Sequence, residues 1–162
     1  LHLAALMKNK GQIIALDIYE WKLAELKRRA KRAGAHNIET RVIEDNKVIK
    51  RLHEKADRLL IDSPCSGLGV LKRNPDSKWK IDQEFIDRIK KEQEKILQDY
   101  AKILKKGGKM IYATCSILPS ENNEQVEIFL KNNEGYSLIK EEKVMPSEGF
   151  DGFYMALIER KA

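Results

Sequence analysis

Residues 56–69 read ADRLLIDSPCSGLG, an apolar run followed by a turn rich in Ser, Pro and Gly. Residues 109–116, KMIYATCS, repeat this form, so each segment carries a cysteine, Cys65 or Cys115, just beyond a predicted strand. Open α/β sheets place ligands and reactive groups at the C-terminal ends of their strands. Since these are the only two cysteines of the chain, we expect their thiols to meet in one crevice, as a nucleophile and a helper.

The segments on either side alternate between strand and helix patterns. Strands are predicted at 12–17, 37–43, 56–62, 109–114, 136–140 and 153–160, and helices at 20–34, 82–106 and 121–132. Residues 67–80 contain Gly, Pro, Asn and Asp without periodicity, which indicates a long loop. This alternation predicts an α/β fold with βαβ crossovers and a mostly parallel sheet, closed by an antiparallel pair at its C-terminal end.

The composition is that of a globular domain of 162 residues, 42% hydrophobic and 35% charged. No apolar run is long enough to cross a bilayer and no signal segment is recognised, so no membrane partner and a cytoplasmic location are expected. Two cysteines exclude a disulfide scaffold, and neither their spacing nor that of the three histidines suits a metal site. The formal net charge of +6 favours an anionic partner, most commonly nucleic acid, although many basic proteins bind none.

One acidic residue ends the first predicted strand and another follows the second. In nucleotide-binding α/β folds an acid at the position of Asp17 accepts hydrogen bonds from both ribose hydroxyls. Asp45, after the next strand, could lie near an adenine amino group. Each acid also fits an ordinary structural role, as a helix cap or a turn residue. The pattern alone leaves both interpretations open.

The turn after the third strand holds Asp62 and Cys65 in one geometry, because Pro64 stiffens the backbone between them. Thiolates are strong nucleophiles when a helix N-terminus or a cation lowers their pKa, and a helix predicted to begin near Ser120 could act in this way on Cys115. An inert buried cysteine is the alternative for Cys65.

The predicted loop carries a basic and aromatic segment, LKRNPDSKWK, at residues 71–80. Cations such as Arg73 and Lys78 can reach phosphates, while Trp79 can stack on an unpaired base, a combination suited to RNA loops or single strands. The alternative is a solvated basic loop whose Trp79 is tucked into the core.

Five segments of the chain fit one family pattern in order. Residues 62–69 match D-[AS]-P-C-[ST]-G-x-G, residues 73–79 match R-x-P-D-x-K-W, and residues 107–116 match G-G-x-x-x-Y-[AS]-T-C-S; LPSEN at 118–122 and DGFY at 151–154 also fit. In these motifs the chain closely resembles the Sun (Fmu) family of RNA cytosine-5 methyltransferases, of the type that acts on bacterial small-subunit ribosomal RNA. The resemblance implies a Rossmann-like class I fold that uses S-adenosylmethionine.

The resemblance also implies a role for each candidate residue. Cys115 would attack C6 of the target cytosine, and Cys65 would assist removal of the C5 proton and release of the enzyme. Asp62 would contact the polar edge of the cytosine and lie near the methyl donor. Asp17 would bind the ribose of S-adenosylmethionine, and Asp45 would lie near its adenine.

One departure from the family pattern concerns the first strand. The family has a strand and a Gly-rich methionine-binding loop, ending G-G-K-[ST], before the segment equivalent to Leu1. We therefore expect residues 1–162 to be a partial methyltransferase catalytic domain that lacks this strand and loop. The alternative function is a catalytically silent RNA-binding or assembly fragment. Retention of both Cys65 and Cys115 favours the enzyme, and the absence of C-x-x-C argues against a thiol redox protein.

Overall fold

The computed structural model describes all 162 residues, which fall into two units, Leu1–Arg51 and Leu52–Ala162. Strands and helices alternate along both, which confirms the predicted α/β class. None of the helices combines the length and the apolar character that crossing a membrane would require.

The first unit is a small parallel βαβ arrangement. Its elements are α1 (His2–Leu6), β1 (Ile13–Asp17), α2 (Glu20–Arg32), β2 (Ile38–Val42) and α3 (Asn46–Lys50). β1 and β2 pair in parallel, with Asp17 opposite Val42. α2 buries Leu23 and Ala30, and the chain leaves it through Gly34 at φ +63°, as a glycine stop predicts. The short helix α3 was not predicted from the sequence.

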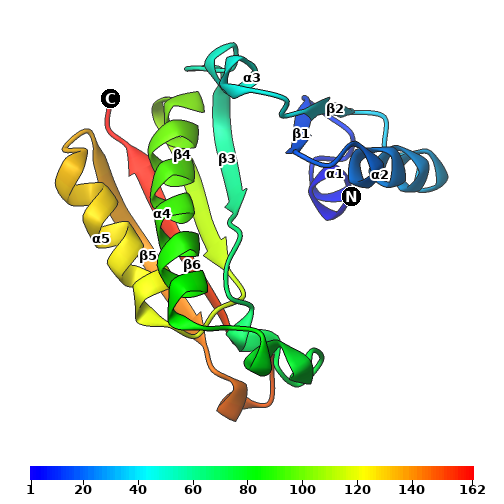
Figure 1. Cartoon of the computed structure of the whole chain (residues 1–162). Helices are drawn as coiled ribbons and strands as arrows, with labels where there is room; N and C mark the ends of the chain where they lie inside the picture. The colour runs from blue at the N-terminus through cyan, green and yellow to red at the C-terminus, as the bar shows by residue number, and fades with distance from the viewer. The chain divides into compact units, whose positions relative to one another are not determined.

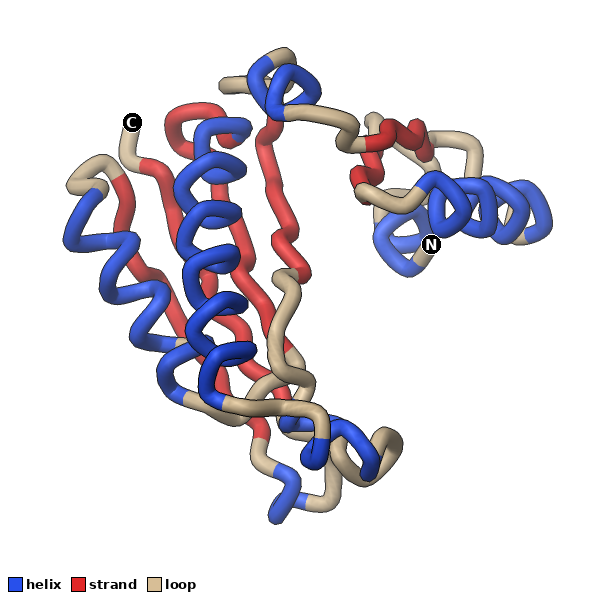
Figure 2. The backbone as a smooth tube through the Cα atoms, in the orientation of Figure 1, coloured by secondary structure: helices blue, strands red, loops and turns tan.

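The second unit contains a mixed sheet with two helices. Its elements are β3 (Ala56–Asp62), η1 (Leu68–Val70), η2 (Pro75–Trp79), α4 (Gln83–Tyr100), η3 (Ala101–Ile103), β4 (Leu104–Thr114), η4 (Pro119–Glu121), α5 (Asn123–Asn132), β5 (Tyr136–Val144), η5 (Pro146–Glu148) and β6 (Phe153–Arg160), where η marks a 3-10 helix. The strand order is β3-β4-β6-β5 (Figure 2). β3 and β4 are parallel, whereas β6 is antiparallel to both of its neighbours, which confirms the predicted antiparallel closing pair. The prediction of a mostly parallel sheet was wrong, because this sheet is mixed and β1 and β2 form a separate sheet.

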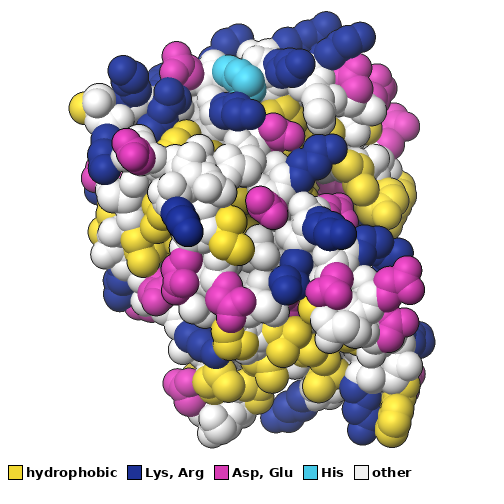
Figure 3. Space-filling model, turned by 60° about the vertical axis from the view of Figure 1, so that its left-hand side comes forward, with side chains coloured by type: hydrophobic (Ala, Val, Ile, Leu, Met, Phe, Trp, Pro, Cys, Tyr) yellow, Lys and Arg dark blue, Asp and Glu magenta, His cyan; other side chains and the backbone are white.

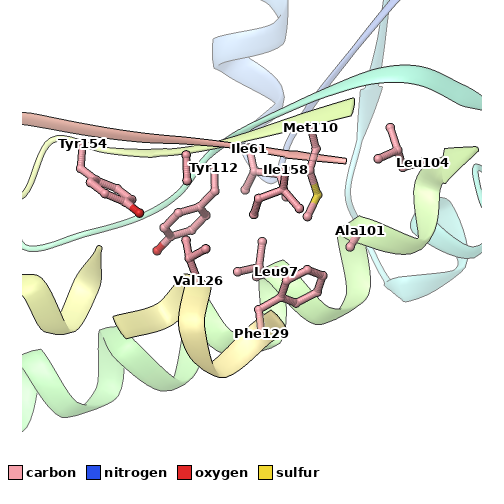
Figure 4. Close-up of a cluster of buried hydrophobic side chains, with 11 residues drawn as sticks. Ile61, Leu97, Ala101, Leu104, Met110, Tyr112, Val126, Phe129, Tyr154 and Ile158 are labelled. Atoms are coloured by element: carbon pink, nitrogen blue, oxygen red, sulfur yellow. The ribbon is translucent and has the colours of Figure 1, made fainter. Parts of the chain in front are cut away.

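The core of the second unit lies between its sheet and the helices α4 and α5, which run side by side on one face (Figure 1). α4 has an apolar stripe that buries Ile89 and Leu97, and α5 contributes Phe129. Leu97 and Phe129 meet Tyr112 of β4 and Ile158 of β6 in one cluster (Figure 4). This packing fixes the two central strands, β4 and β6, against the helices.

The helix predicted at 82–106 ends six positions early, at Tyr100, and the chain is extended from Leu104. The spacing of apolar residues predicted a longer helix because Leu104 falls on its apolar stripe. In the structure Leu104 is fully buried, but as the first residue of β4, opposite Ala56. The glycines expected to stop the helix instead form an irregularity inside β4, where Gly107 has a φ of +72°. A buried leucine at this position fits both a helix and a strand, and only the pairing within the sheet shows which of the two forms.

Two further boundaries and one predicted loop differ from the sequence prediction. The strand predicted at 136–140 continues to Val144, because its pairing with β6 extends that far. The helix predicted at 121–132 begins at Asn123, since a 3-10 turn precedes it. The predicted loop 67–80 contains the short 3-10 helices η1 and η2.

Replacing Leu97 by Ala tests this core. Leu97 is fully buried, so the variant loses apolar burial and leaves a cavity, and we expect the free energy of unfolding to fall by about 2–5 kcal/mol. Leu60, whose side chain is 54% exposed, is the matched control, and Leu60→Ala should cost about 1 kcal/mol or less. Urea unfolding followed by circular dichroism measures both; equal losses would contradict the described core.

Candidate active site

The two cysteine-bearing turns lie at one edge of the sheet. β3 and β4 are adjacent parallel strands with Asp62 opposite Ala113, so both chains leave the sheet on the same side. The Sγ atoms of Cys65 and Cys115 are 3.3 Å apart, within hydrogen-bonding distance for thiols. Both cysteines are free and half-buried. The structure thus brings the two thiols together, as the sequence predicted.

Backbone hydrogen bonds hold the two turns in place, and the backbones approach so closely that no side chain fits between them. The amide of Gly69 donates to the carbonyl of Cys115 at 2.9 Å, and the amide of Gly152 donates to the carbonyl of Gly69 at 2.7 Å. A Cβ atom on Gly69 would lie 2.2 Å from the carbonyl oxygen of Gly152, so no other residue fits there without a shift of the backbone. The start of β6 is in this way joined to both cysteine turns.

A buried carboxylate lies between the two turns. Glu121 is fully buried and accepts hydrogen bonds from the amide of Ser66 at 2.7 Å, the hydroxyl of Ser66 at 2.5 Å and Nε2 of Gln93 at 3.2 Å, as well as from the hydroxyl of Ser116. Ser66 and Ser116 directly follow the two cysteines. Sequence reasoning missed this network, although its signal was present in the serine that follows each cysteine.

The segment between β4 and α5 is tied to itself by further buried hydrogen bonds. The hydroxyl of Thr114 donates to Oδ1 of Asn122 at 2.5 Å, and Nδ2 of Asn122 donates to the carbonyl of Ser116 at 3.0 Å. The hydroxyl of Tyr112 donates to the backbone carbonyl of Glu121 at 2.8 Å. Cys115 therefore lies in a turn whose two ends are both fixed.

The contact between the sulfur atoms makes the two thiols chemically different. The hydrogen bond from Cys65 lowers the pKa of the Cys115 thiol to about 7, although burial and the charges of Asp62 and Glu121 oppose the shift. The same hydrogen bond and burial raise the pKa of the Cys65 thiol well above its ordinary value. Cys115 is thus the thiolate near neutral pH, while Cys65 keeps its proton. The sequence attributed such a shift to the helix near Ser120; in the structure the main cause is Cys65.

The third candidate catalytic residue, Asp62, is the last residue of β3 and is exposed. The charge of Asp62 raises the pKa of the Cys115 thiol. A carboxylate here can accept hydrogen bonds from a polar ligand that enters beside the thiols.

The two acids of the first unit share one edge of the β1–β2 pair. Asp17 Oδ1 accepts from the amide of Tyr19 at 2.8 Å, and Asp45 Oδ1 accepts from the amide of Lys47 at 2.7 Å, as the N-cap of α3. Asp45 therefore has the structural role that the sequence left open. The other carboxylate oxygen of each acid, Oδ2, faces a lysine. Asp17 Oδ2 lies 3.7 Å from Nζ of Lys22, and Asp45 Oδ2 lies 3.6 Å from Nζ of Lys47. These second oxygens are suited to accept hydroxyl or amino hydrogens from a ligand.

The basic and aromatic segment is exposed. Trp79 is 80% exposed, so the interpretation that placed it in the core is wrong. The ammonium of Lys78 lies 4.7 Å from the centre of the Trp79 ring. Arg73 pairs with Asp151 at 2.7 Å, which neutralises part of its charge. Of the two predicted phosphate-binding cations, Lys78 is thus the one without an acidic partner.

Hydrophobic side chains gather toward the lower end of the surface in Figure 3. That end corresponds to the lower end of Figure 1, where η5 and the loop between β3 and α4 lie. A hollow of about 450 Å³ lies in this part of the chain, lined by Val144, Glu148, Phe150, Asp151 and Phe153. No cluster of three or more His, Cys, Asp or Glu side chains suited to a metal ion is present.

The fold is that of class I methyltransferases, as the solved relatives show. The chain belongs to the 16S rRNA methyltransferase RsmB/F family, whose model matches residues 1–159. This confirms the resemblance to the Sun family that the motifs indicated.

Individual relatives agree. The probable ribosomal RNA small subunit methyltransferase B of Bacillus subtilis is 34% identical over 99% of the chain and 40% of its own length. The crystal structure of PH0851 superimposes with a TM-score of 0.93 at 31% identity, over 98% of the chain and 39% of that protein. NSun6 from Pyrococcus horikoshii, solved with SFG, gives a TM-score of 0.88 at 27% identity, over 99% of the chain and 44% of that protein. The chain thus spans about two fifths of the length of these relatives.

The pH dependence of alkylation tests the assignment of the thiolate. Iodoacetamide should modify Cys115 with a midpoint near pH 7, while Cys65 reacts only at much higher pH, because only the thiolate attacks. In Cys65→Ala the donor to Cys115 is lost, so we expect the Cys115 midpoint to rise toward about 8.5, the ordinary value. Mass spectrometry of the two cysteine peptides follows each thiol separately; an unchanged midpoint in Cys65→Ala would show that Cys65 does not cause the low pKa.

Proposed function

We propose that this chain is part of the catalytic domain of an enzyme that transfers a methyl group from S-adenosylmethionine to C5 of a cytosine in RNA, namely small-subunit ribosomal RNA. The observation that carries the proposal is the pair of thiols 3.3 Å apart, one acidified and one held protonated, at the edge where β3 and β4 end. Membership of an rRNA methyltransferase family supports the substrate class.

The first chemical step belongs to Cys115. C5 of cytosine is a poor nucleophile, and addition to C6 makes it reactive. The Cys115 thiolate forms a bond to C6, and the displaced π electrons move into the ring toward N3 and O2. Asp62 lies on the same side of the edge, where its carboxyl group can contact the polar edge of the base and stabilise the charge that develops there. A base inside a duplex cannot be reached by this thiol, so the target must be unpaired or flipped.

The methyl donor fits the acids of the first unit by its chemistry. S-adenosylmethionine supplies the methyl group that C5 takes up, and the donor leaves as a neutral thioether. The second oxygens of Asp17 and Asp45 can accept hydrogen bonds from ribose hydroxyls and the adenine amino group, respectively. SFG, an analogue of S-adenosylmethionine, is present in the structure of the NSun6 relative.

The second chemical step uses Cys65. In the resting site its pKa is raised mainly by its hydrogen bond to Cys115. Once the sulfur of Cys115 is bonded to C6 it no longer carries a charge, so the pKa of Cys65 falls toward its ordinary value and its proton passes to solvent water. The Cys65 thiolate then takes the proton from C5, the C5–C6 double bond re-forms, and Cys115 departs as a thiolate. The raised pKa thus keeps the helper protonated until the nucleophile has reacted.

A catalytically silent RNA-binding or assembly fragment is the second candidate. The exposed Trp79 and Lys78 favour it as much as they favour the enzyme. A silent fragment, however, has no use for one acidified thiol beside a protonated one. The thiol pair therefore favours the enzyme.

Covalent trapping tests the two cysteine roles in the protein that carries this chain at the length of its relatives. Cys115→Ala should lose methylation completely and form no adduct, because no nucleophile remains for C6. Cys65→Ala should still attack and methylate once, but fail to release, and so accumulate a denaturant-resistant protein–RNA adduct when the methyl donor is added. Labelled RNA on a denaturing gel shows both outcomes.

The double variant, Cys65→Ala with Cys115→Ala, is the control and should trap nothing. An adduct with Cys115→Ala and none with Cys65→Ala would reverse the roles. Absence of methylation and of adduct in the wild type would favour the silent fragment.

We further propose that the segment 71–80 binds the RNA, with Trp79 stacking on a base and Lys78 contacting a phosphate. Lys78→Ala should lower RNA affinity and reduce the slope of log affinity against log salt by about 0.7, the value for one phosphate contact on a single strand. Arg73→Ala should act in the same direction but less strongly, since Asp151 already offsets its charge. Trp79→Ala should cost about 1–3 kcal/mol of binding without changing the slope.

Lys131→Ala, on the last turn of α5, is the matched control for loss of one exposed cation. Fluorescence anisotropy across a salt series measures affinity and slope together. If Lys78→Ala behaves like Lys131→Ala, the proposal is contradicted and the segment 71–80 is a solvated loop.

A further inference from the structure

The buried carboxylate of Glu121 has no cation to balance it. Its side chain is fully buried, and none of the ion pairs of the structure includes it. Its partners are an amide, two hydroxyls and a carboxamide, all neutral donors. Removing a carboxylate from water without a cation costs free energy, and packing alone would be served better by an apolar residue. The position therefore calls for a role other than stability.

The four hydrogen bonds show what the carboxylate holds together. Oε1 accepts from the amide of Ser66 and from Gln93, and Oε2 accepts from the hydroxyls of Ser66 and Ser116. The same amide group of Gln93 also donates to the carbonyl of Pro64 at 2.9 Å. The residues on both sides of Cys65, and the residue after Cys115, are thus connected to one carboxyl group.

We propose that Glu121 is a positioning residue for the paired thiols, which bridges Ser66 and Ser116 and thereby keeps the sulfur atoms of Cys65 and Cys115 at hydrogen-bonding distance. Its value to catalysis rests on the proposed function, because there the pair is the nucleophile and its helper. The bridge itself can be tested without RNA or methyl donor.

Glu121 affects the pKa of Cys115 in two opposite ways, so a measurement of that pKa in Glu121 variants can distinguish them. The negative charge of Glu121 raises the pKa of Cys115, so loss of the charge alone would lower that pKa. Loss of the bridge would let the turns separate and weaken the hydrogen bond from Cys65, the largest cause of the low value, so the pKa would rise. The direction of the shift therefore distinguishes positioning from simple electrostatics.

Two substitutions separate the effects further. Glu121→Ala removes both the charge and every acceptor. Glu121→Gln removes the charge but keeps one oxygen for the amide of Ser66 and for Gln93, while its NH₂ group can donate to the two serine hydroxyls. Glu124→Ala, an exposed acid in the first turn of α5, is the matched control.

The experiment is the pH profile of iodoacetamide alkylation at Cys115, read by mass spectrometry, with circular dichroism to show that each variant is folded. Glu121→Ala should move the midpoint from about 7 toward about 8.5 and slow modification at pH 7 by about 15-fold. Glu121→Gln should stay at or below the wild-type midpoint, and Glu124→Ala should match the wild type. A folded Glu121→Ala variant with an unchanged or lowered midpoint overturns the proposal.

If Glu121→Ala does not fold, Ser116→Ala takes its place, since it removes only the arm of the bridge that reaches the Cys115 turn. A raised midpoint supports the bridge, and an unchanged one overturns it. In the protein at the length of its relatives, Glu121→Ala should slow methylation by a similar factor with unchanged RNA affinity. A wild type that does not methylate RNA would refute the proposed function, while the thiol titration would still report on the bridge.

Discussion

The parallel pairing of β3 with β4 is the constraint on which the rest of the candidate site depends. Parallel neighbours deliver their C-terminal ends to one edge of a sheet, and the register of Asp62 opposite Ala113 fixes where each chain leaves it. Cysteines 50 positions apart in sequence thereby come within 3.3 Å. A slip of one residue would turn the side chains of one strand to the opposite face. The thiols would separate, and Cys115 would lose the donor that makes it acidic.

Apolar packing fixes the strands on one side of that edge, and polar contacts fix the turns on the other side. Tyr112 takes part in both kinds of contact. Its ring packs in the core cluster, and its hydroxyl donates to the backbone carbonyl of Glu121. On the core side, Leu97 and Phe129 pack without directional preference and fix the strands. On the other side, Thr114 and the buried carboxylate network set both distance and direction. A reacting pair needs such directional contacts, because its geometry must hold to about half an ångström.

The sequence predicted those features whose cause is local, and missed those whose cause is tertiary. Cys65 and Cys115 were placed correctly beyond strand ends, since in both segments an apolar run is followed by a turn that contains Ser and Pro. The helix end was wrong because Leu104 is buried as a strand residue, and periodicity cannot tell which element buries it. Glu121 was overlooked as a bridge because an acid at the start of a helix normally faces solvent. Its burial depends on donors from turns distant in sequence.

The contact between Gly69 and Gly152 bears on how the protein assembles during synthesis. Gly152 lies just before the last strand, yet its amide binds the carbonyl of Gly69 in the turn after β3. A ribosome releases the chain from its N-terminus, so this turn emerges long before the residue that completes it. Closing so long a loop costs chain entropy that is recovered only when the late contacts form. The nascent chain therefore carries both cysteines before the contact that joins the Cys65 turn to the start of β6 can form.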